Sequence, residues 1–388
     1  MKEIMIITNY YPPEIGAASN RIFHLAKGLQ NLGFETSVIT PLPNYPTGKI
    51  FDGFKGHFKL EARENGIRVF RLWLFASNSK NKILRLLAMV SYSFSLIWFF
   101  LTHKIPKTVI VQSPPLLVAF TCMLFLKRKK RKLVLNVSDL WPSAGLELGV
   151  FKENLSYKLL KKIEEFNYRR ANLVLGQSQE ILDHVSLITP KTEMFLYRNY
   201  PDFQLSKILP QQMDAEKIKL VYAGLLGVAQ GILKLCETLD YSNIEFHIYG
   251  SGAEKESLLS FIESHDGLPI VYHGQVERAT LHKELMNYDV AIIPLLNRIY
   301  GSVPSKIFEY ARLGLPMIYF GGGEGESVIK KHQLGWVVPA GKYDELNNLL
   351  LKLKKEDFTL GFKNNIQKEA VKYFDFEVQL EEFATLLQ

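Results

Sequence analysis

Cysteine is nearly missing from this 388-residue sequence, which contains only Cys122 and Cys236. Two isolated cysteines, with no CxxC pair and no histidine cluster nearby, exclude a disulfide framework, a zinc-thiolate site and redox chemistry, and they fit a reducing cytosol. A signal peptide is not expected either, because the first apolar run, Ile4–Ile7, is too short. The 26 glycines and 17 prolines follow no period, which excludes collagen-like and solenoid architectures.

Charge is divided unequally along the chain. Residues 1–200 carry 28 Lys and Arg against 14 Asp and Glu, whereas residues 201–388 carry 19 against 25. A basic half is typical of proteins that meet nucleic acid, anionic lipid or a phosphorylated substrate. Nucleic acid is disfavoured because the run of six basic residues at 127–132 contains no aromatic residue and no known binding module accompanies it.

Short apolar runs alternate with helical patterns through both halves. The first half has strands at 4–7, 36–39, 109–112, 133–137 and 173–176, with helices at 21–29 and 156–170 between them. After a linker at 200–217, five more strands end in glycine or proline: 220–223, 245–249, 270–273, 290–293 and 316–320. This alternation predicts two α/β domains with parallel sheets, and ligands of such sheets gather at the carboxyl ends of the strands.

Two apolar segments in the first half lie beside basic residues. Residues 83–101 carry a single charge, and the run 116–126 is followed directly by six basic residues, Lys127, Arg128, Lys129, Lys130, Arg131 and Lys132. One interpretation is an edge that lies on an anionic membrane surface, where each basic residue contributes about 1 kcal/mol. The alternative is two core helices followed by a solvated turn. We favour the membrane edge over the two core helices. A true membrane span is the least favoured of the three interpretations.

The most specific chemistry is in the segment 303–316, VPSKIFEYARLGLP. Pro304 is placed for the first turn of a helix, so Ser305, Lys306 and Ile307 are expected to present free backbone amides to phosphate oxygens. Glu309, one turn later, is suited to accept hydrogen bonds from the two hydroxyls of a ribose. Taken alone, Glu309 and Lys306 are each more often ordinary residues of a helix surface. Together with the glycine-rich loops they favour a nucleotide site.

Several motifs occur together in a recognisable order: TNYYPPEIGAASNR near the start, SDLWPSAGLELG from Ser138, YAGLLGVAQGI from Tyr222, HIYGSGAEKESL from His247, and VPSKIFEYARLGLPMI. In this arrangement the chain resembles retaining glycosyltransferases of the GT-B fold, of the family 4 type. More narrowly, it is similar to bacterial L-fucosamine transferases of surface-polysaccharide synthesis. The resemblance implies two Rossmann-like domains whose parallel sheets face each other across a cleft, with 1–200 plus 373–388 on the acceptor side and 201–372 on the donor side.

The resemblance also implies roles for individual residues. Glu309 matches the second glutamate of the E-x7-E motif, and Gly16 matches a glycine that approaches the donor phosphates. The remaining donor-binding candidates lie in the loops of the second domain: Gly227, Gln230, Gly250, Gly252, Gln275, Val276, Arg298, Ser305 and Lys306.

Three departures from the family pattern matter. Gly301 stands where the first glutamate of E-x7-E would be, and Leu225 and Gln230 stand where relatives place an Arg and a Lys. The neutralisation of the diphosphate then depends on Lys306, the helix amides or Arg298. The usual His-Asp pair reads Ser138-Asp139, which leaves Asp139 as the candidate catalytic carboxylate; the alternative for Asp139 is a helix cap or turn residue.

We therefore expect a retaining glycosyltransferase that needs no metal or other cofactor. The expected donor is a UDP-sugar, although GDP is left open, and the expected acceptor is a glycan or a polyprenyl-diphosphate-linked sugar. Such an enzyme would be cytoplasmic and peripheral to the inner face of the cell membrane. The alternatives are a non-hydrolysing nucleotide-sugar epimerase of the same architecture and a non-catalytic polysaccharide-assembly scaffold.

Overall fold

The computed structural model describes residues 2–79, 81–147, 149, 152–204, 208, 216–296 and 300–387. The chain divides into two compact units. Unit 1 comprises Met1–Asn199, Ile299–Ser302 and Glu377–Gln388, and unit 2 comprises Tyr200–Arg298 and Val303–Phe376. The stretch 300–302, which the sequence analysis places in the second domain, groups with unit 1.

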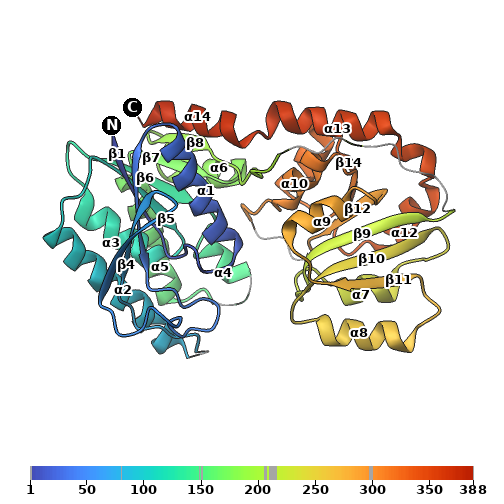
Figure 1. The fold of residues 1–388 in the computed structure, drawn as a ribbon, viewed down its shortest axis with the longest axis horizontal. Coiled ribbons are helices and arrows are strands. Elements are labelled where there is room, and N and C mark those ends of the chain that lie inside the picture. Colours follow the sequence, from blue (N-terminus) through green and yellow to red (C-terminus); the bar gives the residue numbers. More distant parts are fainter. Residues whose placement is uncertain are drawn as a thin grey trace. The chain divides into compact units, whose positions relative to one another are not determined.

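Unit 1 is built on an eight-stranded sheet with helices on both faces (Figure 1). Its elements are β1 (Glu3–Ile7), α1 (Ala17–Asn31), β2 (Glu35–Pro41), β3 (Lys59–Glu64), β4 (Ile67–Leu72), α2 (Lys82–Thr102), β5 (Thr108–Ser113), α3 (Leu116–Leu126), β6 (Lys132–Val137), α4 (Ser143–Glu147), α5 (Leu155–Arg170), β7 (Leu173–Gly176), α6 (Gln179–Ile188), β8 (Glu193–Leu196) and α14 (Phe376–Leu386). Both chain ends lie at the same end of this unit (Figure 1).

The strands of unit 1 run in the order β3-β4-β2-β1-β5-β6-β7-β8. All neighbouring strands are parallel except β3 and β4, which form an antiparallel pair at one edge. Strand order reverses between β1 and β5, and the crevice at such a reversal is where open parallel sheets bind ligands. The loop after β1, which contains Gly16, therefore starts at the crevice where a ligand of this sheet is expected to bind.

Apolar spacing explains how helices cover this sheet. In α1, Ile22, Leu25, Ala26 and Leu29 are buried at intervals of three and four residues, which places them on one face of the helix. The strands β5 and β6 are buried along nearly their whole length, as expected for a parallel sheet covered on both faces. Cys122 of α3 is fully buried in the same core, and Cys236 is buried in unit 2.

The helix α2 is apolar on two faces but buried on only one. Tyr92, Leu96 and Phe99 pack in the core of unit 1, whereas Ile83, Phe94 and Trp98 are 68%, 67% and 61% exposed. Among the described residues, no helix is long and apolar enough to cross a membrane.

Unit 2 is a six-stranded, fully parallel sheet in the order β11-β10-β9-β12-β13-β14. Its elements are β9 (Ile218–Leu225), α7 (Ile232–Thr238), β10 (Ile244–Ser251), α8 (Lys255–Ser264), β11 (Ile270–Gly274), α9 (Arg278–Leu285), β12 (Val290–Pro294), α10 (Lys306–Leu313), β13 (Met317–Phe320), α11 (Glu324–Lys331), β14 (Gly335–Val338), α12 (Tyr343–Lys352), the 3-10 helix η1 (Lys355–Phe358) and α13 (Leu360–Tyr373). Alternate side chains of β9 pack in two hydrophobic cores, one on each face of the sheet. Leu220 and Tyr222 lie in one core, and Val221 and Ala223 lie in the other.

The strand order of unit 2, counted from its first strand, is 3-2-1-4-5-6, the order of the Rossmann fold. The two α/β domains with Rossmann-like sheets are thus confirmed. All the strands expected from the sequence are present, and the structure adds β3, β4, β8 and β14. The expectation of purely parallel sheets is wrong for β3, because a tight turn at Asn65-Gly66 joins this short edge strand directly to β4 and makes the two antiparallel.

Candidate functional site

The candidate site of unit 2 lies where β9 ends and α10 begins. The reversal of strand order falls between β9 and β12, and α10 follows β12 along the chain. The side chains of Lys306 and Glu309 come from the first turn of α10. Topology therefore brings the helix segment singled out in the sequence to the carboxyl edge of the sheet, where ligands of such folds bind.

Glu309 is held in place by two basic side chains of α9. Its Oε1 accepts a hydrogen bond from His282 Nε2 at 2.7 Å and lies 3.3 Å from Arg278 Nε. Burial raises the pKa of the Glu309 carboxyl, but the His282 hydrogen bond and the charges of Lys306 and Arg278 outweigh it and lower the pKa to about 2. The group is thus a carboxylate at any physiological pH. Within the described part of the chain, its Oε2 has no protein partner, so this oxygen is available to a ligand hydroxyl.

Lys306 occupies space that only a glycine provides. A Cβ on Gly224, near the end of β9, would lie 2.7 Å from Lys306 Cε and 2.9 Å from its Nζ. The ammonium also lies 5.8 Å from the centre of the Tyr310 ring. Burial lowers the pKa of Lys306, while Glu309 opposes this shift. A partly desolvated cation next to a carboxylate suits a ligand that has both phosphate and hydroxyl groups.

The amides at the start of α10 differ in part from expectation. Ser305 is the N-cap and Lys306 the first helical residue, so Pro304 precedes the helix rather than opening it. Ile307 N–H donates to Pro304 O at 3.1 Å, and Glu309 N–H donates to Ser305 O at 3.1 Å. The prediction of a free Ile307 amide is therefore wrong, because the chain makes a tight turn there, and only the amides of Ser305 and Lys306 remain as candidates.

The glycines of the β10 loop are required by the protein itself. A Cβ on Gly250, whose φ is +134°, would lie 1.8 Å from Gly224 O, and one on Gly252 would lie 2.3 Å from Leu226 O. Gly250 pairs with Gly224 at the ends of the strands β10 and β9, and Gly252 meets Leu226 just beyond these ends. The close approach that the sequence suggested for a nucleotide is made here by neighbouring backbone, although both glycines still lie at the carboxyl edge of the sheet, where the candidate site is.

The remaining candidates of unit 2 surround the same edge. Gly227 O accepts hydrogen bonds from the amides of Gln230 and Gly231, which closes the turn before α7. Gln275 is exposed and Val276 is half-buried in the loop between β11 and α9. Arg298 lies outside the described residues. The roles of all these residues stay predictions.

Gly301, at the position of the missing glutamate, belongs to unit 1. Its N–H donates to Glu180 Oε2 at 2.9 Å, and its carbonyl accepts from Ser178 Oγ at 2.7 Å. Its φ is +83°, and a Cβ would lie 3.0 Å from Ile181 and 3.1 Å from Leu140. The backbone conformation and the crowding both favour glycine, so a glutamate would be strained here.

The candidates of unit 1 lie at the carboxyl edge of its sheet. Gly16 is the N-cap of α1. Asp139 directly follows Ser138, whose Oγ accepts a 2.6 Å hydrogen bond from Arg21 of α1. Burial raises the pKa of Asp139, and the Arg21 charge opposes the shift. Gln112 Nε2 also donates to Ser138 Oγ, so a buried polar chain positions the residue beside Asp139.

The six basic residues before β6 are not equivalent. Arg131 donates to the carbonyls of Ile105, Pro106 and Leu126, and Lys127 donates to Arg170 O at 2.8 Å. Lys132 belongs to β6 and contacts Leu386 O and Glu193. The remaining three, Arg128, Lys129 and Lys130, are exposed. Half of the run therefore stabilises the fold, which the sequence alone did not indicate.

The sequence analysis missed three residues of the candidate site: Gly224, Arg278 and His282. The available signal is the spacing of four residues between Arg278 and His282, which places both on one face of α9 once this segment is helical. Gly224 was noted only as the end of a strand.

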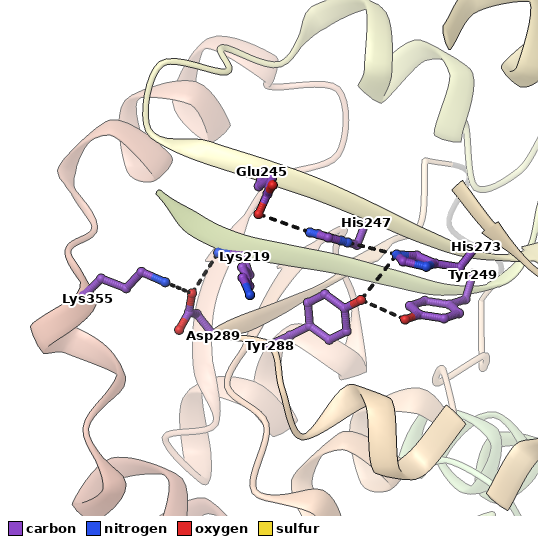
Figure 2. Close-up of polar contacts among 8 residues, drawn as sticks. All are labelled: Lys219, Glu245, His247, Tyr249, His273, Tyr288, Asp289 and Lys355. Atoms are coloured by element: carbon purple, nitrogen blue, oxygen red, sulfur yellow. Dashed lines mark hydrogen bonds and ion pairs between the residues drawn. The ribbon is translucent and has the colours of Figure 1, made fainter. Parts of the chain in front are cut away.

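Unit 2 contains a second polar cluster, away from α10. Figure 2 shows Glu245 and His247 of β10 joined in a chain with His273 of β11 and with Tyr288, which lies between α9 and β12. His247 Nδ1 and His273 Nε2 are 2.9 Å apart, and the ring planes differ by only 13°, with centroids 5.2 Å apart. At this separation the rings lie side by side and share one hydrogen. Burial lowers the pKa of both histidines, so the pair is neutral near pH 7.

Across the described ranges, no three His, Cys, Asp or Glu side chains are grouped so as to hold a metal ion.

Comparisons with known proteins agree with this architecture. Residues 16–192 match the family model described as a glycosyl transferase 4-like domain, and residues 218–356 match the model described as glycosyl transferases group 1. No curated protein matches the sequence significantly.

Solved structures resemble the whole chain. A sucrose-phosphate synthase from Thermosynechococcus elongatus superposes with a TM-score of 0.72 at 13% identity, covering 100% of this chain and 98% of the other. HepE of Anabaena, in complex with UDP and glucose, gives 0.69 at 15% identity, covering 100% and 99%. The lipopolysaccharide outer core galactosyltransferase WaaB gives 0.67 at 15% identity, covering 99% of each chain. At these identities the likeness establishes the GT-B fold. A specific similarity to fucosamine transferases stays a prediction.

Proposed function

Because the chain is a glycosyltransferase built from a 4-like domain and a group 1 domain, we propose that it transfers an N-acetylated amino sugar from a UDP-sugar to a polyprenyl-diphosphate-linked or other glycan acceptor. The transfer retains the anomeric configuration, needs no metal and serves bacterial surface-polysaccharide synthesis. The observation that carries the proposal is the pairing of Lys306 with Glu309 at the carboxyl edge of unit 2.

The chemistry of these two side chains fits a nucleoside diphosphate. The Lys306 ammonium and the amides of Ser305 and Lys306 supply fixed positive charge for a leaving diphosphate. Glu309, ionised and held through Oε1 by His282, keeps Oε2 for the ribose hydroxyls. HepE, a structural neighbour, is described in complex with UDP, which supports the choice of UDP over GDP.

The acceptor side of the proposal rests on Asp139. Retention requires that the acceptor hydroxyl lose its proton on the face from which the diphosphate leaves. A phosphate oxygen of the donor accepts that proton in our proposal, and the Asp139 carboxylate orients the hydroxyl.

Binding measurements test the donor site. Purified protein is screened by thermal shift against UDP- and GDP-sugars, since a ligand of the folded state raises its melting temperature. We expect UDP-sugars to stabilise the protein and Glu309→Gln to weaken binding about tenfold or more, as for loss of a hydrogen bond to a charged group. Glu326→Gln is the matched control, because the Glu326 carboxylate accepts a hydrogen bond from Lys330 of the same helix, α11. Equal binding by wild type and Glu309→Gln would contradict the site.

Product analysis tests the reaction. With donor and a lipid-linked or glycan acceptor, NMR should show a new glycosidic bond with the donor's anomeric configuration, unchanged by EDTA. Conversion of the donor to another sugar without acceptor would indicate an epimerase instead. Failure to bind any nucleotide sugar would favour a scaffold.

The exposed face of α2 supports the proposal of a membrane-bound acceptor. Ile83, Leu87, Phe94, Trp98 and Leu101 recur at three- to seven-residue intervals, which places them along one side of the helix, and all are exposed. A helix of this length extends about 31 Å. Exposed aromatic residues beside basic ones are typical of helices that lie in a membrane interface. We therefore propose that unit 1 binds the inner face of the cell membrane through α2.

Vesicle binding tests this association. Phe94→Ser/Trp98→Ser should reduce binding to anionic vesicles more than tenfold, because each buried large apolar side chain contributes about 1.5–3 kcal/mol. Leu187→Ser, which removes an even more exposed apolar residue from α6, should bind as wild type does. Unchanged binding by the α2 variant would refute the proposed contact.

A further inference from the structure

A surface pocket lies in unit 1 where the chain enters β5 and β6. It is formed by the end of α2 with the residues after it and by the end of α3 with the residues after it. Its lining residues are Phe100, His103, Lys104, Ile105, Phe125, Leu126, Arg128 and Arg131.

The pocket is basic: among the residues that the structure describes, its lining includes Lys104, Arg128 and Arg131 and no acidic residue. Arg131 is fixed by its hydrogen bonds to three carbonyls, at 3.0–3.1 Å. Lys104 and Arg128 are exposed at the rim. Burial and the neighbouring Arg128 both lower the pKa of Arg131, which reflects the repulsion between the two cations. Like charges gathered at one point are stabilised when an anion binds among them.

A histidine of the pocket lining holds a further cation beside the pocket. His103 Nε2 is 3.0 Å from Lys59 Nζ, and its Nδ1 is 2.8 Å from Thr102 Oγ1. An ammonium can only donate, so Nε2 accepts and Nδ1 carries the hydrogen. Lys59 is thereby held next to the pocket as a further cation.

The other wall of the pocket is apolar and continues into the exposed face of α2. Phe100 and Phe125 line it, Phe125 is 45% exposed, and Leu101 beside it is 75% exposed. A free phosphate would gain nothing from this wall, whereas a lipid would place its chains against it and its phosphate among the cations.

The location separates this pocket from the candidate substrate site. Residues 103–107 precede β5 and residues 127–131 precede β6, so the pocket lies at the amino edge of the sheet. Asp139 follows β6 and lies at the carboxyl edge. A lipid bound in the pocket therefore anchors the protein and is not the acceptor.

We propose that this pocket binds the phosphate of an anionic phospholipid, with Lys104, Arg128 and Arg131 around the phosphate and the acyl chains along Phe125 and α2. The inference rests on the proposed membrane association and specifies the lipid group that is recognised.

Two double variants of equal charge test the proposal. Lys104→Gln/Arg128→Gln removes two cations that line the pocket, and Lys129→Gln/Lys130→Gln removes two exposed cations that do not. All four side chains are exposed, so both proteins should melt as wild type does. Sedimentation with phosphatidylcholine vesicles containing phosphatidylglycerol gives the affinities. We expect the pocket variant to bind at least about tenfold more weakly than the control variant, because it also loses charged hydrogen bonds.

The outcomes are distinct. Equal weakening of both variants would leave membrane association standing and overturn the pocket. Absence of vesicle binding by wild type would refute the proposed association itself. A further experiment uses inorganic phosphate. If millimolar phosphate stabilises wild type but not the pocket variant, and also displaces the protein from the vesicles, the pocket is a site for free phosphate. The lipid proposal then fails.

Discussion

The side chain of Lys306 lies over Gly224, within 2.7 Å of the point where a Cβ would be. An alanine at this position must displace the lysine, whose flexible end can move at little cost to the fold. We expect Gly224→Ala to change the free energy of unfolding by less than about 1 kcal/mol and to weaken UDP-sugar binding about tenfold, as Lys306→Ala would. Calorimetric titration and thermal unfolding of both variants measure this, and tight binding by Gly224→Ala would show that Lys306 does not contact the donor.

Gly250 and Gly252 should behave differently from Gly224. Here an added Cβ meets backbone atoms of the neighbouring loop, which cannot move aside. We expect Gly250→Ala and Gly252→Ala each to lower the free energy of unfolding by more than about 2 kcal/mol. Gly267→Ala is the control, since nothing lies within 4 Å of its Cβ position, and it should stay within about 1 kcal/mol of wild type. Urea unfolding distinguishes the three, and wild-type stability of Gly250→Ala would disprove the packing argument.

Arg21 opposes the rise in the pKa of Asp139 that burial causes, and the pH dependence of the proposed catalysis should depend on this charge. Burial raises the pKa of the carboxyl and Arg21 lowers it, so Arg21→Gln should raise it further. If the ionised form is required, activity falls as the pH drops through this pKa, and the acidic limb of the rate profile moves to higher pH in Arg21→Gln. Arg21→Lys should restore most of the wild-type limb. A variant with uniformly reduced activity and an unmoved limb would assign Arg21 a structural role only.

The neutral pair His247 and His273 predicts a loss of stability in acid. The pKa of each imidazole is lowered in the folded state by burial, so the unfolded chain binds more protons below its usual value of about 6.5. Stability is therefore fully present above that pH and is lost as the pH falls below it. The groups facing the pair are Glu245, Glu284, Lys219 and Tyr288. Urea unfolding at pH 7.5 and 5.5 measures the free energy of unfolding at each pH. This free energy should decrease less between the two pH values for His247→Asn/His273→Asn than for wild type. An equal decrease would locate the acid sensitivity elsewhere.

The sequence predicted the architecture because its strands are buried on both faces. Residues 173–176 are four buried apolar residues and were found as β7 with the same bounds. The strand β3, with the sequence KLEARE, was missed because it is a mostly exposed edge strand without an apolar run. Strand order, which creates the crevice at β9 and β12, is a tertiary property that no local pattern contains.

The site was predicted only in part, because local patterns predict neighbours within one helix and not contacts between helices. Lys306 and Glu309 are three residues apart on one helix, so their joint position follows from helical geometry. Arg278 and His282 come from another helix, and their contact with Glu309 depends on packing. In the sequence, the basic run 127–132 is six equivalent charges. In the structure, Lys127, Arg131 and Lys132 are bound to carbonyl and carboxylate oxygens of the protein.

Both cysteines are buried, and burial raises the pKa of both thiols. Thiolate is the form that reacts with maleimides, so the native protein should be almost inert to them. A cysteine introduced at an exposed position of α2 would then be the one reactive thiol, and a single environment-sensitive fluorophore could be attached there without altering the native sequence elsewhere. The depth of each α2 position in a bilayer thus becomes measurable residue by residue.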